Sequence, residues 1–227
     1  MLSPPLRYGI ALMAICPSAP LAMRRVQKAG ADHQLAALIQ VGAAFLAIVT
    51  VPLMEFLFPS QFGVEGWIVS PEDIALQVSR VQVLPLLIGL SMRHWRPEIA
   101  VRLQRPLDWL ASGLLLLMIA LLLIKVSPFA LDFLMSNGPG MLAITLMAAA
   151  ALMVGLVVTA GQQEHRISVM LLITLRNPGL ALLLANRGAE RIRGINLAIL
   201  LYLLITFLIA QLLSRRTTSF ESIHPGL

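Results

Sequence analysis

The feature that most constrains this chain is a polar break inside an apolar stretch. Residues 167–188 are long and apolar enough to cross a bilayer, yet Arg176, Asn177, Pro178 and Gly179 lie at their middle. Pro178 removes a backbone donor and disfavours helix at Asn177, while Gly179 tolerates unusual backbone angles. We therefore predict two half-helices that meet deep in the membrane. A proline-kinked helix whose arginine faces a partner is the alternative.

Composition is typical of a polytopic membrane protein. Of the 227 residues, 58% are hydrophobic and 12% are charged, and the mean hydropathy is +0.85. Soluble domains carry about 25% charged residues. The net charge of +6 comes from basic residues in short loops, a pattern that sets membrane topology, so we expect no nucleic-acid partner. The single Cys16 excludes an internal disulfide and a thiolate cluster for a metal.

Seven apolar segments follow one another, each close to the roughly 20 residues that a bilayer requires. They cover residues 7–23, 34–58, 74–90, 107–126, 139–160, 167–188 and 195–213. The first segment is also interrupted, because Pro17 and Pro20 cannot both continue one regular helix. The sequence therefore predicts an all-α polytopic membrane protein with seven crossings, two of which are broken helices.

Alternate loops of this predicted topology differ in charge. The loops after the first, third and fifth segments, together with the tail at residues 214–227, hold ten lysines and arginines, and the opposite side holds five. Basic loops remain in the cytoplasm. We therefore expect an integral protein of the cell (inner) membrane whose C-terminus is cytoplasmic. The basic turn at residues 187–193 is an exception to this pattern.

The first two segments resemble the last two in plan, since a broken helix, a basic turn and an unbroken helix occur in both. Pro17 precedes Gln34 by 17 residues, and Pro178 precedes Ile195 by the same number. An offset of five crossings makes the broken helices run in opposite directions, as in an inverted-repeat transporter. The predicted units are the end of a first repeat (1–58), a complete second repeat (59–213) and a cytoplasmic polar tail (214–227). On this interpretation three crossings are missing ahead of Met1, and the chain holds seven of ten.

These segments resemble a known family. Residues 16–20 (Cys-Pro-Ser-Ala-Pro), 83–90 (Val-Leu-Pro-Leu-Leu-Ile-Gly-Leu) and 174–181 (Thr-Leu-Arg-Asn-Pro-Gly-Leu-Ala) are similar to the bile acid:sodium symporter family. The resemblance covers residues 4–213 and corresponds to the family's last seven crossings. It implies two broken helices that cross in a core domain, with a separate panel domain beside them.

The resemblance also implies sodium sites, whose side chains differ in this chain. Sodium-coupled members carry an acidic residue and a glutamine in the second broken helix, where this chain has Leu172 and Arg176. Residues 21–23 (Leu-Ala-Met) replace small hydroxyl and amide side chains at the first break, and residues 45–49 are apolar. Hard cations need several oxygen ligands. We therefore expect no cofactor and no intact sodium sites.

The first functional hypothesis is a secondary transporter of a small organic anion. Arg176 and the half-helix that starts near Leu180 supply positive charge at the midplane, where the arginine takes the electrostatic role of sodium. Asn177 orients the substrate, and Ser18 with the backbone around Pro17 lines the opposite side. For Ser18, a plain hydroxyl at a helix break is the alternative. The predicted helix-break residues are Pro17, Pro20, Pro178 and Gly179.

Two other classes of function compete with transport. A truncated, non-transporting membrane protein, a sensor or a structural subunit, would keep the fold, and the lost sodium ligands favour it. An intramembrane enzyme is the weakest hypothesis, because the chain has no H-E-x-x-H and no G-x-S-x-G motif. We therefore expect no enzymatic activity. The expected partners are the lipid bilayer, the organic anion and the missing amino-terminal segments.

Overall fold

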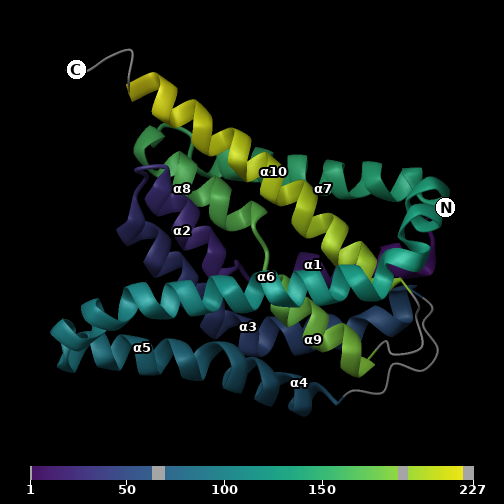
Figure 1. The fold of residues 1–227 in the computed structure, drawn as a ribbon, viewed down its shortest axis with the longest axis horizontal. Coiled ribbons are helices and arrows are strands. Elements are labelled where there is room, and N and C mark those ends of the chain that lie inside the picture. Colours follow the sequence, from purple (N-terminus) through teal and green to yellow (C-terminus); the bar gives the residue numbers. More distant parts are fainter. Residues whose placement is uncertain (1, 63–69, 189–193, 222–227) are drawn as a thin grey trace.

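The structure, a computed structural model, describes residues 2–62, 70–188 and 194–221 as a set of helices (Figure 1). Within these ranges the only extended pairing is a single bridge between Ser18 and Arg176. This confirms the all-α class. The helices are α1 (Pro4–Ile15), α2 (Pro20–Lys28), α3 (His33–Phe62), α4 (Pro71–Val78), the π-helical turn η1 (Ser79–Val83), α5 (Leu84–Trp95), α6 (Pro97–Ser136), α7 (Gly138–Val158), α8 (Gln163–Thr174), α9 (Pro178–Gly188) and α10 (Ile195–Glu221).

The first broken helix consists of α1 and α2. Pro17 disfavours helix at the residue before it, and Cys16 accordingly ends α1 with extended angles, φ −65° and ψ 137°. Pro20 begins α2, a position that tolerates proline because the missing N–H has no helical partner there. The basic residues after the break were predicted in a loop, which is wrong. Arg25 and Lys28 form the last turn of α2, where positive charge complements the helix dipole.

The second broken helix consists of α8 and α9, as predicted. Leu175 ends α8 with extended angles, φ −86° and ψ 90°, and α9 begins at Pro178. The Asn177 side chain caps α9, because its Oδ1 accepts a hydrogen bond of 3.2 Å from the Leu180 N–H. A continuous kinked helix, the alternative for this stretch, is therefore wrong.

Two predicted loops are also helical in the structure. α6 runs without interruption from Pro97 to Ser136 and contains Pro106 and Pro128. Most of the loops expected at residues 93–105 and 127–138 therefore belong to this helix. Each proline removes one backbone hydrogen bond, but the leucine-rich sequence between them favours helix strongly.

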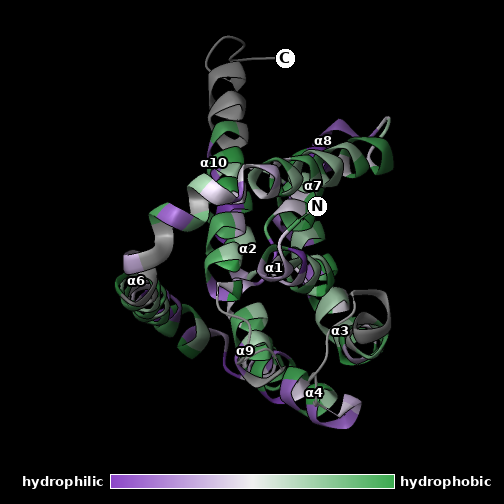
Figure 2. Ribbon diagram, turned by 90° about the vertical axis from the view of Figure 1, so that its right-hand side faces the viewer, coloured by the Kyte–Doolittle hydropathy of each residue, from purple (hydrophilic) through white to green (hydrophobic). Residues whose placement is uncertain are grey.

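Four helical stretches of the described chain are long and apolar enough to span a membrane. They are His33–Met54, Pro71–Trp95, Gly138–Val158 and Ile195–Leu212. The broken helices are too short in each half to meet this criterion, so the number of crossings stays a prediction. The apolar outer faces nevertheless confirm an integral membrane protein, and Figure 2 shows hydrophobic residues along the outer helices, α6 included.

The helices run back and forth between two ends of the molecule (Figure 1). The junctions α2–α3, α5–α6 and α7–α8 and the C-terminal end of α10 lie at one end, on the left in the figure. The start of α1, the α6–α7 junction and the end of α9 lie at the other end. The two broken helices therefore run in opposite directions, as the predicted inverted repeat requires. Which membrane face each end occupies stays a prediction.

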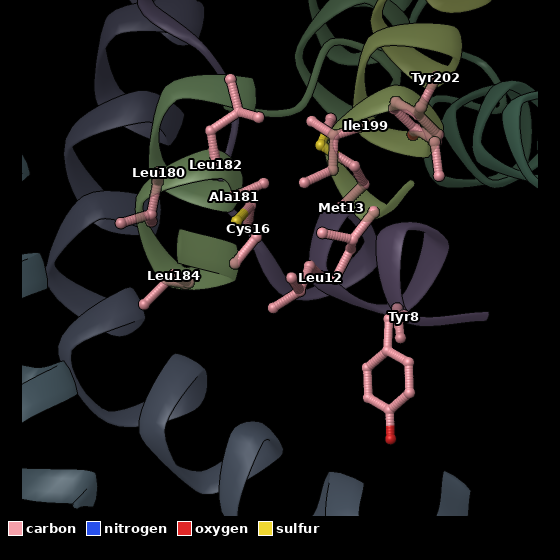
Figure 3. Packing of buried hydrophobic residues seen from close by; sticks show 14 of the residues in the cluster. Tyr8, Leu12, Met13, Cys16, Leu180, Ala181, Leu182, Leu184, Ile199 and Tyr202 are labelled. Atoms are coloured by element: carbon pink, nitrogen blue, oxygen red, sulfur yellow. The ribbon is translucent and has the colours of Figure 1, made fainter. Parts of the chain in front are cut away.

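The largest buried cluster joins α1, α9 and α10. Figure 3 shows Leu12 and Met13 of α1 with Leu180 of α9 and Ile199 and Tyr202 of α10, all at most 2% exposed. α1 and α9 each adjoin one of the breaks, and α10 packs against both of these helices. The cluster therefore fixes the relative position of the breaks.

Asp32 connects the loop after α2 to the start of α8. Its Oδ1 accepts hydrogen bonds from the N–H groups of Gln34 (3.0 Å) and Leu35 (2.9 Å), and its Oδ2 lies 2.8 Å from His165 Nδ1. Ser168 Oγ donates to the Asp32 carbonyl at 2.8 Å. The hydrogen bond from Leu35, followed by those from Gln34 and His165, lowers the pKa of Asp32, although desolvation opposes this shift.

This lowered pKa predicts an acid-sensitive contact. A carboxylate whose folded-state pKa is depressed stabilises the fold above its unfolded pKa, about 3.9, and loses this contribution as the pH falls through the folded value. We expect Asp32→Asn, which keeps the cap of α3, to flatten the fall in melting temperature between about pH 5 and pH 3. Thermal unfolding in detergent measures this, with Glu98→Gln as the control, because Glu98 is exposed and forms no ion pair within the described ranges. An unchanged acid response of Asp32→Asn contradicts the prediction.

Candidate functional site

The two helix breaks cross and pair with each other. Ser18 and Arg176 form an antiparallel bridge. The Ala19 N–H donates to the Leu175 carbonyl at 2.8 Å, and the Asn177 N–H donates to the Pro17 carbonyl at 2.9 Å. Backbone groups that no helix satisfies must find partners within the protein at membrane depth, and each break supplies them to the other. The predicted helix-break residues are thus brought together.

Ser18 faces α3 at this crossing. It is 5% exposed, and its Oγ donates to Gln40 Oε1 at 2.6 Å. Gln40 Nε2 donates in return to the Ser18 carbonyl at 3.0 Å. Gln40 was not predicted as a site residue. In the sequence, Gln40 is an amide within an apolar segment, and nothing in the neighbouring residues indicates that this segment packs against the first break.

Arg176 lies at the carboxyl-terminal end of α1. Its Nη1 donates to the carbonyl of Cys16, the residue that caps α1, at 3.3 Å. A helix C-terminus carries partial negative charge, which stabilises the guanidinium. Arg176 Nε is buried and has no hydrogen-bond partner among the described residues.

No carboxylate in the described ranges pairs with Arg176. Asp108, at the start of the apolar segment predicted at residues 107–126, instead forms an ion pair with Arg24, in which Oδ1 lies 2.7 Å from Nη2. That guanidinium also donates to the Asp108 carbonyl at 2.9 Å and to the Ser112 hydroxyl. The positive charge of Arg176 is therefore balanced by backbone carbonyl dipoles rather than by an acidic side chain.

Two half-helices begin at the crossing, α2 at Pro20 and α9 at Pro178. Pro178 is buried, whereas Pro20 and Gly179 are exposed. The amino-terminal ends of helices carry partial positive charge, and here both lie close to Arg176. The carboxyl-terminal ends of α1 and α8 meet at the same crossing and offset these partial charges, so the net positive charge that suits an anion comes from Arg176.

Thr174 and Tyr202 lie behind Arg176, and sequence reasoning did not identify them. Both are fully buried, and the Tyr202 hydroxyl donates to the Thr174 carbonyl at 3.5 Å. The Tyr202 hydroxyl also lies close to the Arg176 guanidinium. Thr174 Oγ1 is buried without a hydrogen-bond partner in the described part of the chain. The Tyr202 hydroxyl and Thr174 Oγ1 are thus polar groups among the mostly apolar side chains that pack near Arg176.

Three of the positions that the family resemblance aligns with sodium sites lie in an apolar cluster. Leu172 and Ala22 are 2% and 0% exposed, and Met23 packs against them. None of these side chains carries an oxygen atom. Nor do the residues that the structure describes include a group of three or more His, Cys, Asp or Glu side chains able to hold a metal ion.

A sequence model described as the Sodium Bile acid symporter family matches residues 1–132. The match covers 132 of 227 residues, more than half of the chain, and includes the first broken helix. The second break lies outside it. A search of curated proteins finds no match.

Proposed function

Because this chain belongs to the sodium bile acid symporter family, we propose that it is a secondary transporter of a small organic anion that works without intact sodium sites. Family membership supports a symporter-like transporter in general. One observation carries the finer proposal: Arg176 lies at the crossing of two broken helices without a carboxylate partner in the described chain.

The guanidinium of Arg176 supports a carboxylate as the anionic group. Nη1 donates to the Cys16 carbonyl, whereas Nε is buried and lacks a hydrogen-bond partner in the described chain, so a ligand that reaches this edge would meet Nε and Nη2. These two donors match the two oxygens of a carboxylate in a bidentate pair. A positive site with one planar fork favours carboxylates over neutral solutes of similar size.

The position of Arg176 also supports the loss of sodium coupling. In transporters with broken helices, the carboxyl-terminal ends of half-helices coordinate the sodium ion. Here the guanidinium donates to the carbonyl that ends α1, so a tethered cation occupies the place that a coupling ion would take. The apolar cluster around Leu172 offers no replacement ligand nearby.

Ligand binding should therefore be the same in sodium and in potassium. We expect the dissociation constant of cholate, used as the probe anion, to differ by less than about twofold between NaCl and KCl at equal ionic strength, because both salts screen charge equally. Cholate-dependent thermal stabilisation of the purified chain measures this constant. Binding about tenfold tighter in sodium would mean that oxygen ligands for the ion come from elsewhere.

A sensor or structural protein is the second candidate, because the replaced sodium ligands also fit a protein that binds an anion without moving it. Exchange of labelled cholate across proteoliposomes distinguishes the two. A transporter exchanges internal for external cholate, whereas a sensor binds cholate and shows no exchange above empty liposomes. Binding without exchange would therefore favour the second candidate.

A further inference from the structure

The junction of α5 and α6 exposes four arginines that no other part of the described chain covers. Arg93 and Arg96 end α5, and Arg102 and Arg105 lie near the start of α6. All four are exposed, and none forms an ion pair within the described ranges. Glu98, the only acidic residue between them, makes no ion pair there either. This junction therefore carries a net positive charge that no ion pair offsets within the described ranges.

One face of α6 combines two of these arginines with a tryptophan. At 3.6 residues per turn, Arg102, Arg105 and Trp109 lie along the same side of the helix. Trp109 is 77% exposed, and Trp95, the last residue of α5, is 74% exposed. Arg24 of α2 contacts Asp108 and Ser112, which lie directly beside this face, since Ser112 is about two turns after Arg105. Arg102, Arg105 and Trp109 nevertheless remain exposed next to this contact.

The apolar surface of α6 begins where the basic face ends. Leu110, Leu114 and Leu117 are 58%, 56% and 54% exposed, which suits contact with acyl chains. Tryptophan side chains favour the boundary between acyl chains and headgroups. The arginines near Trp109 consequently lie at the level of lipid headgroups when α6 is in a bilayer.

We propose that this basic face of α6 (Arg102, Arg105 and Trp109), together with Trp95 at the end of α5, binds the headgroup of an anionic phospholipid. The two guanidinium groups donate to the phosphate oxygens, and charge-assisted hydrogen bonds of this kind are the strong ones. The indole rings pack against the glycerol and upper acyl region. Zwitterionic lipids lack the net charge, so the face prefers phosphatidylglycerol over phosphatidylcholine. This proposal does not depend on the function proposed above.

Tryptophan quenching by brominated lipids tests this preference. The full chain with Trp67→Phe, which leaves emission from Trp95 and Trp109, is reconstituted in phosphatidylcholine bilayers that contain equal fractions of either brominated phosphatidylglycerol or brominated phosphatidylcholine. We expect brominated phosphatidylglycerol to associate about threefold to fivefold more strongly, and the preference to fall at high salt. The pair Arg102→Gln and Arg105→Gln should reduce it to about one.

The controls separate this site from net charge. The pair Arg7→Gln and Arg80→Gln removes the same charge from exposed positions elsewhere and should leave the preference unchanged. The pair Arg102→Lys and Arg105→Lys should retain more of it than the glutamine pair. Equal quenching by both lipids, or an unchanged preference in the glutamine pair, overturns the proposal. The absence of quenching by either lipid also overturns it, because a second protein molecule would then cover the face.

Discussion

Replacing Arg176 by alanine is expected to weaken binding of an organic anion such as cholate by about a hundredfold while the chain stays folded. Removing one partner of a desolvated, hydrogen-bonded charge pair costs about 2–5 kcal/mol, which corresponds to at least a thirtyfold change in affinity. Folding should survive, because Arg176 is only partly buried and the hydrogen bond of its Nη1 to the Cys16 carbonyl is long, at 3.3 Å. Calorimetric titration of the purified chain with cholate measures the affinity.

Two further variants define what Arg176 contributes. Arg176→Lys keeps the positive charge and loses the planar fork, so binding should fall by less than in Arg176→Ala. Arg80→Ala removes an exposed arginine of η1 and serves as the matched control with unchanged affinity. If Arg176→Ala bound cholate like the unmodified chain, the anion site would have to be placed elsewhere.

Gly9→Leu is expected to cause the largest loss of stability among single substitutions in the core. A Cβ atom at Gly9 would lie 2.5 Å from the Ala198 Cβ and 3.4 Å from the Ile195 carbonyl oxygen, so α1 and α10 would have to separate. Overpacking of this kind costs about 3 kcal/mol or more, which lowers the melting temperature of a chain of this size by about 10 °C. Thermal unfolding in detergent measures the shift.

A glycine in open space provides the comparison. A Cβ atom added at Gly113 of α6 would have no heavy atom within 4 Å, so Gly113→Leu meets no neighbour and gains helix propensity. We expect its melting temperature to equal or exceed that of the unmodified chain. A similar loss in both variants would mean that leucine acts through helix propensity or solubility rather than through the contact between α1 and α10.

The parts of the fold that local chemistry dictates were predictable from the sequence. Pro17 and Pro20 lie three residues apart, and Pro178 is followed by Gly179, so both stretches disfavour a continuous helix and indicated the positions of the breaks. Their opposite directions followed from counting apolar segments. The length of α6 was underestimated, because prolines and arginines are usual loop signals, although the long leucine-rich sequence keeps Pro106 and Pro128 within one helix.

The candidate site was predictable only in part. Arg176 was identified because an arginine within an apolar segment is costly and usually functional. Gln40, Thr174 and Tyr202 were not, since each acquires its role from a contact with a distant part of the chain. Asn177 was predicted to orient the substrate, and its Oδ1 is bound as the cap of α9, which leaves the amide nitrogen for that role. Its part in binding stays a prediction.

The mutual pairing of the two breaks has a consequence for biosynthesis. The first break leaves the ribosome long before its partner, because Cys16 and Arg176 are 160 residues apart. Until the second break arrives, the Pro17 carbonyl and the Ala19 N–H lack their hydrogen-bond partners, and hydrocarbon cannot solvate them. We therefore expect α1 and α2 to stay in contact with water or with another protein, such as the lateral opening of the insertion machinery, until the second break is synthesised. Membrane integration of this chain is thus expected to end with a late, concerted entry of both broken helices rather than to proceed helix by helix.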